Sequence, residues 1–498
     1  MRPILCFLVI LITANSSGQL YKTARFDGQS TIGTLKIPGK YSYNNATQEF
    51  TLSGSGSNIW DAHDNFFFSW RKMKGDFILN CRVRFKGLGK NEHRKIGWMV
   101  RQSLDPTSAY ADVALHGDGL VALQYRKTNG GTTEEIRSEI KNPDVLQLQK
   151  KGNVYIVSVA QFGEPLREAG RISVDLKDSV YAGIFICSHE ENASETAVFS
   201  NLRISVPQAD TSTQYRGAIG SVLEIMEVAT GNRKIIYSTP DVIEAPNWMP
   251  DGSNLLYNSN GLLHRFHLPT KTPVTLNTDF AKRNNNDHLI SADGKWIAIS
   301  NHSTETSPSG ESQIFVLPIK GGKPRQVTKF GPSYLHGWTP DGKTLAYCAM
   351  RNNNYDVYTI PIEGGAETRL TTAEGLDDGP EYTPDGKYIY FNSNRTGTMH
   401  IWRMKPDGSE QTQITNDSLN NWFAHISPDG KWMVFLTFGR DVRSGDHPPN
   451  KQVMIRLMPV DGSIKPKTLA YVYGGQGTIN VPSWSPDGKY VAFVSYSF

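Results

Sequence analysis

The amino-acid sequence predicts an all-β protein in which an N-terminal β-sandwich is followed by a six-bladed β-propeller. In the second half of the chain six copies of a Pro/Ala-Asp-Gly tripeptide recur at a regular spacing, with their Asp at 251, 293, 341, 385, 429 and 487. This spacing is close to the roughly 40–45 residues of a four-stranded propeller blade. In the first half, seven or more short β-prone runs are separated by Gly, Asn and Asp turns, which is typical of a β-sandwich.

Each repeat has the same order of features. An aromatic residue or Ile stands two positions before the Pro or Ala of the tripeptide, and a β-prone run follows it. Pro-Asp-Gly favours a tight turn because Pro presets φ, Asp bonds to nearby backbone amides and Gly tolerates a positive φ. We therefore expect this turn to join the first and second strands of a blade, with two further strands after it and no helix between them.

The two ends of the repeat region predict a closed ring. The sixth copy is followed by one more strand-like run, Tyr490–Ser497, while Val222–Val228 and Lys234–Tyr237 before the first copy resemble a third and a fourth strand. A blade built from both ends leaves no open sheet edge. We assign residues 24–206 to the sandwich, 207–216 to a linker and 217–498 to the propeller.

The most apolar run lies at the N-terminus. Arg2 is followed by Ile4–Ile12 and then by the small residues Ser16, Ser17 and Gly18, which is the order found in secretory signal peptides. The run is too short to span a bilayer. We expect residues 1–18 to be removed and the mature protein to be periplasmic or secreted, without a membrane span.

Charge and cysteine content narrow the classes of function. The 52 Lys and Arg residues against 48 Asp and Glu give a net charge of +4, so no nucleic-acid partner is expected. Cys81, Cys187 and Cys348 are too few for a disulfide framework. A Cys81–Cys187 bridge and buried free thiols both stay open, and the free thiols are favoured because buried Cys behaves as a small apolar residue.

The repeats resemble the PD40 (WD40-like) repeats of the TolB-like propeller family. The resemblance rests on Trp484-Ser-Pro-Asp-Gly-Lys, Tyr390-Phe-Asn-Ser-Asn-Arg-Thr-Gly and Ile401-Trp-Arg-Met-Lys-Pro-Asp-Gly. It implies the propeller fold and leaves the activity open, because propellers of this type serve as scaffolds, peptidase gates and lyases. There is no Gly-x-Ser-x-Gly motif for a propeller-gated peptidase.

The first half resembles the concanavalin A-like lectin/glucanase sandwiches of the DUF1349 type. Gly75-Asp-Phe-Ile and Lys95-Ile-Gly-Trp-Met-Val-Arg carry this resemblance. It implies that aromatic residues on a concave face hold sugar, and Trp60, Trp70, Trp98 and Tyr125 are the candidates. The alternative is that these side chains belong to the core, as most aromatic residues on strands do. No adjacent pair of acids typical of a glucanase site is present.

Polar residues gather in the loops that lead into the first strand of each blade. First strands line the central channel, so these residues converge at one mouth. The loops that join second and third strands reach the same end and add Arg351 and Arg395, which suit a carboxylated or sulfated ligand; solvated surface Arg is the alternative. The predicted ligand-binding residues are Asn286, Asp287, Tyr334, Arg351, Asp377, Asp378, Arg395, Trp422 and Asn480.

Three histidines occupy similar positions in their blades. His288 and His336 stand four residues before the Pro or Ala of the turn, and His425 stands three before it. They predict a site for one divalent metal (Mn, Ca or Zn), with Gln476, Asp378 or water completing the shell. This set resembles the metal-bearing channel of oligogalacturonate lyases by position only, and a polar channel with hydrogen-bonded histidines remains the alternative.

Two functions follow from these features. The first is an exported protein that binds an oligosaccharide or an envelope protein at the channel mouth, with a lectin-like accessory domain. The second is a metal-dependent lyase or hydrolase that acts on acidic oligosaccharides, with His336, His425 and Asp378 as the candidate catalytic residues.

Overall fold

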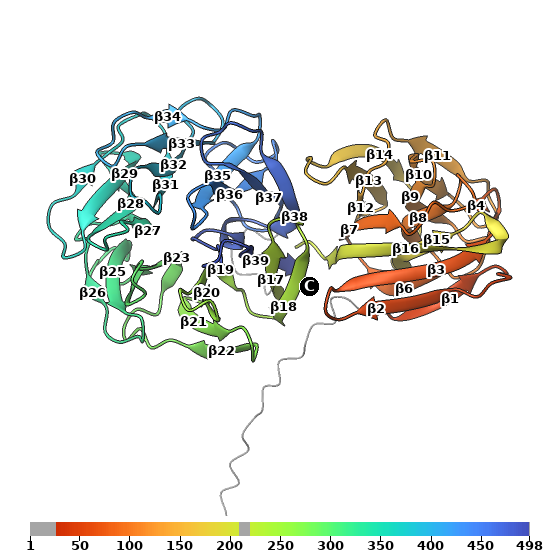
Figure 1. Ribbon diagram of the computed structural model, residues 1–498, viewed down its shortest axis with the longest axis horizontal. Helices are drawn as coiled ribbons and strands as arrows, with labels where there is room; N and C mark the ends of the chain where they lie inside the picture. The colour runs from red at the N-terminus through yellow and green to blue at the C-terminus, as the bar shows by residue number, and fades with distance from the viewer. Residues whose placement is uncertain (1–25, 209–219, 498) are drawn as a thin grey trace, which may run out of the picture.

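The computed structural model describes residues 26–208 and 220–497, in which the regular elements are 39 strands and one short 3-10 helix. Two β-domains lie side by side, the N-terminal one in red to yellow and the C-terminal one in green to blue (Figure 1). The predicted signal peptide, residues 1–18, and most of the predicted linker lie outside the described residues. Within those residues, no helix is long and apolar enough to cross a membrane.

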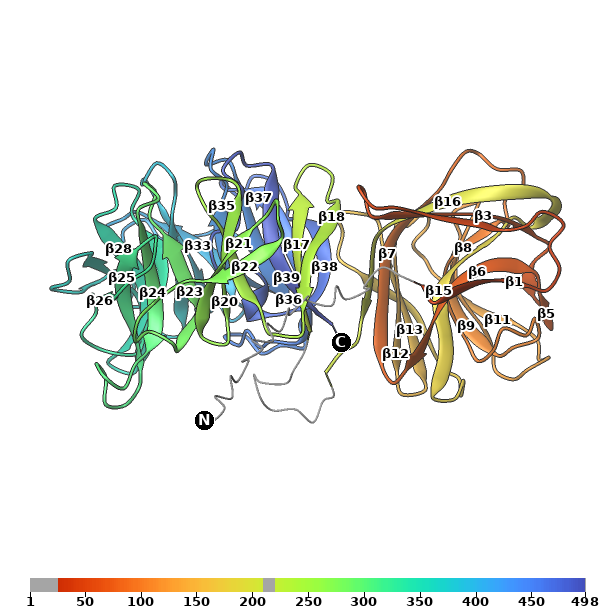
Figure 2. The ribbon, with the colours of Figure 1, turned by 90° about the horizontal axis from the view of Figure 1, so that it is seen from below.

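The N-terminal domain is a β-sandwich of two seven-stranded antiparallel sheets (Figure 2). The first sheet has the order β1 (Gly28–Ile32), β6 (Phe66–Lys74), β15 (Ser179–Cys187), β8 (Lys95–Arg101), β9 (Tyr110–His116), β10 (Val121–Arg126) and β11 (Glu134–Arg137). The second has the order β14 (Arg167–Ser173), β13 (Val154–Ala160), β12 (Val145–Lys151), β7 (Phe77–Phe85), β16 (Glu190–Ser205), β3 (Glu49–Gly56) and β2 (Lys40–Asn44). A small hairpin pairs β4 (Ile59–Trp60) with β5 (His63–Asp64).

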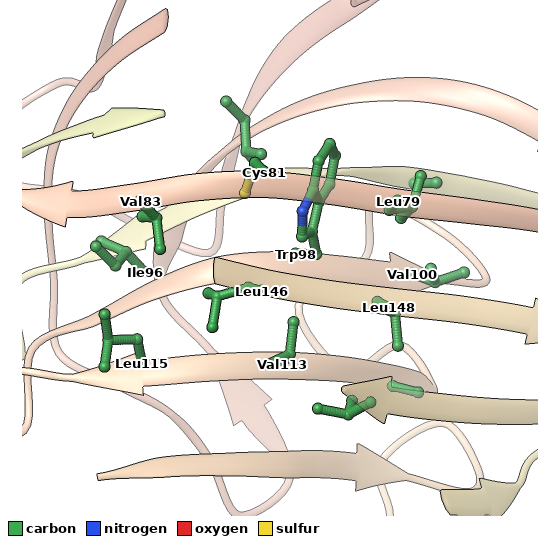
Figure 3. Packing of buried hydrophobic residues seen from close by; sticks show 14 of the residues in the cluster. Leu79, Cys81, Val83, Ile96, Trp98, Val100, Val113, Leu115, Leu146 and Leu148 are labelled. Carbon is green, nitrogen blue, oxygen red and sulfur yellow. The ribbon is translucent and has the colours of Figure 1, made fainter. Parts of the chain in front are cut away.

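The sandwich core lies between the two sheets. Alternate residues of β7 and β8 enter it, and Figure 3 shows Cys81 and Trp98 among them. Trp98 is fully buried and Tyr125 is 7% exposed, so these two predicted sugar-stacking residues belong to the core. Trp60 and Trp70 are half-buried. The Cys81–Cys187 bridge is not formed, and the three described cysteines are free and buried.

The C-terminal domain is the predicted six-bladed propeller. Blades 1 to 5 are four-stranded antiparallel sheets with strands in chain order, so each blade is a meander whose first strand is innermost. Their strands are β19 (Glu244–Trp248), β20 (Asn254–Ser259), β21 (Leu262–His267) and β22 (Thr272–Thr275) in blade 1; β23 (Asn284–Ile290), β24 (Trp296–His302), β25 (Ser312–Pro318) and β26 (Arg325–Gln326) in blade 2; β27 (Ser333–Trp338), β28 (Thr344–Arg351), β29 (Asn354–Pro361) and β30 (Thr368–Arg369) in blade 3; β31 (Asp377–Tyr382), β32 (Ile389–Ser393), β33 (His400–Met404) and β34 (Thr412–Gln413) in blade 4; and β35 (Asn420–Ile426), β36 (Trp432–Phe438), β37 (Lys451–Pro459) and β38 (Lys467–Gly474) in blade 5.

Blade 6 closes the ring from both ends of the domain, as the sequence predicted. Its sheet has the order β18 (Arg233–Thr239), β17 (Gly220–Glu227) and β39 (Tyr490–Ser497). A single bridge between Trp484 and Val491 marks the place of the innermost strand. The short helix η1 (Gln476–Thr478) leads from blade 5 into this blade.

The Pro/Ala-Asp-Gly turns adopt the predicted geometry. In blade 4, Oδ1 of Asp385 accepts hydrogen bonds from the Lys387 amide (3.1 Å) and the Thr383 hydroxyl (2.7 Å). Gly386 follows with φ of 71°, where a side chain is disfavoured. The same turn recurs in the other blades, so all six turns lie at one end of the ring and the loops leading into the first strands lie at the other.

A buried ion pair network joins the two domains. Glu224 of β17 lies between Arg203 of β16 and Arg233 of β18, with closest distances of 2.6 and 2.7 Å. The Glu224 side chain is fully buried. Although burial alone would raise the pKa of Glu224, the two guanidinium groups lower it to about 2. The sandwich is therefore fixed against blade 6, on the outside of the ring.

Candidate functional site

A cavity of about 1060 Å³ opens at the end of the propeller opposite the Pro/Ala-Asp-Gly turns. It is lined by the first residues of the innermost strands of blades 1 to 4 and the segments just before them, by residues at the junctions of second and third strands, and by the long loop of blade 5. Among the predicted site residues, the lining includes Asn286, Asp287, Tyr334, His336, Asp378 and Gln476.

One position of the repeat supplies a large part of this lining. The residues seven before the Asp of each turn are Glu244, Asn286, Tyr334, Asp378, Trp422 and Asn480 in blades 1 to 6. The first four of them line the cavity. The innermost strands of blades 1 to 5 all break their regular pairing close to this position. Such bulges re-aim side chains at the rims of barrels, and here they accompany the polar residues of the mouth.

His336 of blade 3 lies between two carboxylates. Its Nε2 atom is 3.3 Å from Oδ1 of Asp378 and 3.9 Å from Oδ1 of Asp287. Burial opposes protonation of His336, but the attraction of Asp287 and Asp378 outweighs it and raises the pKa of the imidazole. Burial also acts against ionisation of Asp378, yet His336 lowers the pKa of this carboxyl to about 2. Each side chain therefore favours the charged form of the other, as in a buried ion pair.

The carboxylate of Asp287 is held by amides. Oδ1 accepts a hydrogen bond from Nδ2 of Asn480 (2.7 Å), and Oδ2 accepts one from Nδ2 of Asn285 (2.6 Å). These donors are neutral, so they orient the carboxylate without cancelling its charge. Burial raises the pKa of Asp287 above its ordinary value, and His336 opposes this rise.

Glu244 adds a third carboxyl group to the cavity wall. Within the described residues its side chain has neither a hydrogen-bond nor an ion-pair partner. Burial, followed by repulsion from Asp287, raises the pKa of Glu244 to about 7. The sequence analysis missed this residue, although it occupies the same repeat position as Asn286, Tyr334 and Asp378. That shared position was the signal that could have identified it.

Aromatic rings form another part of the mouth. The His336 imidazole stacks on Phe423, with ring centroids 5.8 Å apart and an interplanar angle of 19°. His447 lines the cavity and lies edge-on to Phe423 at 5.6 Å and to Trp422 at 4.4 Å. Trp422 itself is fully buried. It packs against the His447 ring and is not among the residues that line the cavity.

Both predicted anion-binding arginines are engaged within their own blades. The Arg351 guanidinium donates to both carboxylate oxygens of Glu367, at 2.7 and 3.0 Å. Arg395 donates to Asp377 (2.7 Å) and to Gln411 (2.6 Å). Neither arginine lines the cavity, and Asp377 serves as the partner of Arg395. The structure therefore does not support a guanidinium clamp for an acidic ligand at the mouth.

Comparisons with known proteins identify the family to which the repeats belong. The family described as the TolB beta propeller domain (PD40) matches residues 333–444. An uncharacterised protein of Agrobacterium fabrum (strain C58) is 46% identical over 296 residues, which are 59% of this chain and 99% of that protein. The chain belongs to the TolB-like β-propeller family.

A solved structure of a relative agrees with this membership. A TolB-type protein from Agrobacterium tumefaciens is 47% identical, with a TM-score of 0.53, and the match covers 56% of this chain and 99% of that one. TolB from Acinetobacter baumannii is 19% identical with a TM-score of 0.40, over 52% of this chain and 65% of that one. The two Agrobacterium proteins are matched over 99% of their own length, but they match only 59% and 56% of this chain. The remainder of this chain has no counterpart in them.

The histidines of this TolB-like propeller do not offer a shared set of free nitrogens for a metal. Both ring nitrogens of His425 are engaged: Nε2 donates to the Ile479 carbonyl (3.2 Å), and Nδ1 bonds a carboxyl oxygen of Glu381 (2.7 Å). His288 is fully buried, with Nε2 3.3 Å from the Leu256 carbonyl, and burial lowers its pKa to about 4. His336 is paired with Asp378. In residues 26–208 and 220–497 no group of three or more His, Cys, Asp and Glu side chains could hold a metal ion.

The TolB-like propeller has a second cavity, of about 870 Å³, at the opposite end of the ring. It lies between blades 5 and 6 and includes the turn residues Asp429 and Asp487 and the exposed side chains of Trp432 and Ile464. Its walls are largely apolar and contain no histidine. Of the two cavities, only the one at the mouth opposite the turns is lined by histidines, which are His302, His336 and His447.

Proposed function

We propose that this TolB-like protein is an exported binding protein and that the mouth of its propeller channel holds a ligand. The observation that carries the proposal is the convergence of Glu244, Asp287, His336 and Asp378 on one large cavity. They come from the innermost strands of four consecutive blades. Preorganised polar groups in a concave site are the usual basis of specific ligand recognition. The export rests on the signal-peptide pattern of residues 1–18, which places the protein in the periplasm or outside the cell.

The ligand is a segment of a protein or a glycan, and the shape and chemistry of the mouth favour the protein segment. The cavity combines carboxylates, amides and aromatic edges, and its carboxylates can pair with the basic side chains of a protein segment. The sandwich, proposed as a concanavalin A-like accessory domain, keeps Trp60 and Trp70 as half-buried candidates for sugar contact. Trp98 and Tyr125 are in its core and are removed from that list.

We do not propose the metal-dependent lyase or hydrolase. That mechanism needs a metal held by His288, His336 and His425, with Gln476 or Asp378. In this arrangement one histidine is saturated by hydrogen bonds, one is deep between strands and one is ion-paired. The residues therefore do not fit the metal, and no catalytic step is derived from it.

Arrays of peptides and of glycans test the proposal with the mature protein, residues 19–498. A Tyr334→Ala/Asn286→Ala variant changes two side chains of the mouth, and a Trp432→Ala/Ile464→Ala variant changes the opposite end of the ring. We expect the first variant to lose the ligands that the wild type retains and the second to keep them, with unchanged circular dichroism in both. Ligands retained by the mouth variant and lost by the opposite variant would contradict the proposal.

A further inference from the structure

The channel mouth carries more negative than positive charge at its floor. Glu244, Asp287 and Asp378 are three carboxyl groups, and His336 is the imidazole placed among them. His336 pairs with Asp378 more closely than with Asp287. Glu244 is thus left without a cationic partner in the described part of the chain, and Asp287 shares His336 with Asp378 at the longer distance of 3.9 Å. The hydrogen bonds that Asp287, at 2% exposure, accepts come only from neutral amides.

Three carboxyl groups that share one cationic side chain in a shielded cavity are costly for the free protein. Removal from water destabilises a charge unless an opposite charge replaces the lost hydration. A ligand that brings a positive charge between Glu244 and Asp287 relieves this cost, and an anionic ligand increases it. Asn480 supports Asp287 from outside the cavity lining: its Nδ2 donates to Asp287, and its buried Oδ1 has no hydrogen-bond partner.

The rim of the cavity is positive on balance. Lys282, Arg283 and Asp241 line it and are exposed, which gives two cations against one anion. A ligand with a positive group at the floor and a negative group at the rim matches this distribution. A protein segment in which a basic residue is flanked by acidic residues has this pattern, whereas a polymer of amino sugars, positive along its length, meets repulsion at the rim.

We propose that the mouth binds a protein segment through one Lys or Arg side chain, whose ammonium or guanidinium group lies between Glu244 and Asp287. This inference rests on the proposed function and names the ligand chemistry of that same site. Nitrogen donors on the ligand would then reach the carboxylates of Glu244 and Asp287. The carboxylates beside the basic residue would lie near Lys282 and Arg283.

Synthetic peptides test the charge requirement without any change in the protein. Acetylated and amidated pools carry a fixed central residue, an Asp two positions to either side, and randomised uncharged residues elsewhere. The central residue is Lys, Arg, citrulline, norleucine or Glu, and binding is measured by fluorescence anisotropy. We expect the Lys or Arg pool to bind at least about tenfold more tightly than the citrulline and norleucine pools. Equal binding of all pools, or no binding by any pool, would overturn the inference.

Protein variants then locate the charge. Glu244→Gln and Asp287→Asn keep the shape of the side chains, and each should weaken binding of the Lys or Arg pool about tenfold. The matched control is Asp429→Asn, in the turn at the opposite end of the ring, which should leave the affinity unchanged. An affinity that falls equally in the control, or in none of the variants, would contradict the assignment.

The pH dependence gives an independent readout. Besides Asp287, the ionisable groups that line the cavity around Glu244 are Asp241, Lys282, Arg283, His302, Tyr334, His336, Cys348, Tyr355, Asp378 and His447. Since a basic side chain binds best when Glu244 is ionised, affinity should rise between pH 6 and pH 8 and should rise less in Glu244→Gln. A rise of the same size in both proteins would assign the effect to another group and overturn the role of Glu244.

Two outcomes separate this inference from the proposed function. Array ligands that need an intact mouth but carry no basic residue would overturn the charge inference and leave the binding function standing. A fully deacetylated glucosamine tetramer that binds more tightly than every peptide pool would replace the protein segment by a glycan. Peptides that bind the Tyr334→Ala/Asn286→Ala variant as well as the wild type would contradict the proposed function itself.

Discussion

His336 and Asp378 form a buried ion pair at the channel mouth, with 3.3 Å between Nε2 and Oδ1. Neither side chain is more than about a tenth exposed, at 6% and 11%. Removing the charge of one member of a buried ion pair leaves the other charge uncompensated. This pair therefore fixes the relative positions of blades 3 and 4 as well as the charge of the cavity floor.

Removing the anionic partner should destabilise the protein. We expect Asp378→Asn to lower the free energy of unfolding by about 3 kcal/mol near neutral pH, measured by urea denaturation. Glu363→Gln, which removes an exposed pair with Arg325, should change it by less than about 0.5 kcal/mol. Because the pKa of Asp378 is lowered from 3.8 to about 2, its contribution is present above pH 4 and should be lost as the pH falls towards 2. Equal effects of the two substitutions would contradict the buried pair.

Glu244 should make stability depend on pH in the opposite sense. The folded protein holds its proton up to a pKa of about 7, against the ordinary 4.5, so ionisation of Glu244 costs stability as the pH rises from 4.5 to 7. Glu244→Gln removes this cost. We expect the variant to match the wild type at pH 4 and to be more stable at pH 8, by the order of 2 kcal/mol. A constant difference at both pH values would show that Glu244 does not titrate in this range.

The contact between the domains can be tested at Glu224. Glu224→Gln leaves Arg203 and Arg233 in a buried site without their anion, which should cost about 3 kcal/mol or more. Differential scanning calorimetry should show one transition for the wild type and two separated transitions for the variant. Two transitions already present in the wild type would show that the ion pairs do not couple the domains. Since the pKa of Glu224 is about 2, the coupling should persist as the pH falls to about 4.

Two glycines with similar φ angles allow the effect of backbone strain on stability to be measured apart from the effect of side-chain crowding. Gly252 has φ of 69° with nothing within 4 Å of an added Cβ, and Gly379 has φ of 61° with Nδ2 of Asn392 at 2.5 Å. Gly252→Ala should lower stability by about 1 kcal/mol. Gly379→Ala should cost more, because Asn392 must move and its Oδ1 accepts the Phe423 amide. Thermal unfolding of both variants checks the order, and the reverse order would contradict the packing around Asn392.

The sequence predicted the fold because its signals are local and repeated. Each Pro/Ala-Asp-Gly turn is stabilised by its own Asp and Gly, so the number of copies equals the number of blades. The strand-like runs before the first copy and after the last one identify the sixth blade, which both ends of the domain share. The sandwich followed from its turns and strand runs. The ion pairs of Glu224 could not be predicted, because they join residues of two domains whose contact leaves no local pattern.

The site was predicted in part, for reasons of register and charge. The entrance to the innermost strand of a blade faces the cavity, and the sequence shows where each entrance lies. The predicted residues that line the cavity for this reason are Asn286, Asp287, Tyr334, His336, Asp378 and Gln476. Arg351 and Arg395 were expected at the same mouth, but acidic and amide partners 16 residues later in the chain hold them inside their blades. His425 was expected to face a metal, and a bulge in β35 turns it towards Glu381 instead. Such pairings depend on the partner side chain, which register alone does not reveal.

Site-specific photocrosslinking tests the central claim, that the polar mouth is the binding face. p-Benzoylphenylalanine replaces Tyr334 at the mouth in one protein and Trp432 at the opposite end of the ring in another, and both are irradiated in cells that export them. We predict a discrete adduct from position 334, suppressed by an excess of the Lys-centred peptide pool, and none from position 432. An adduct from position 432 with none from position 334 would contradict the account.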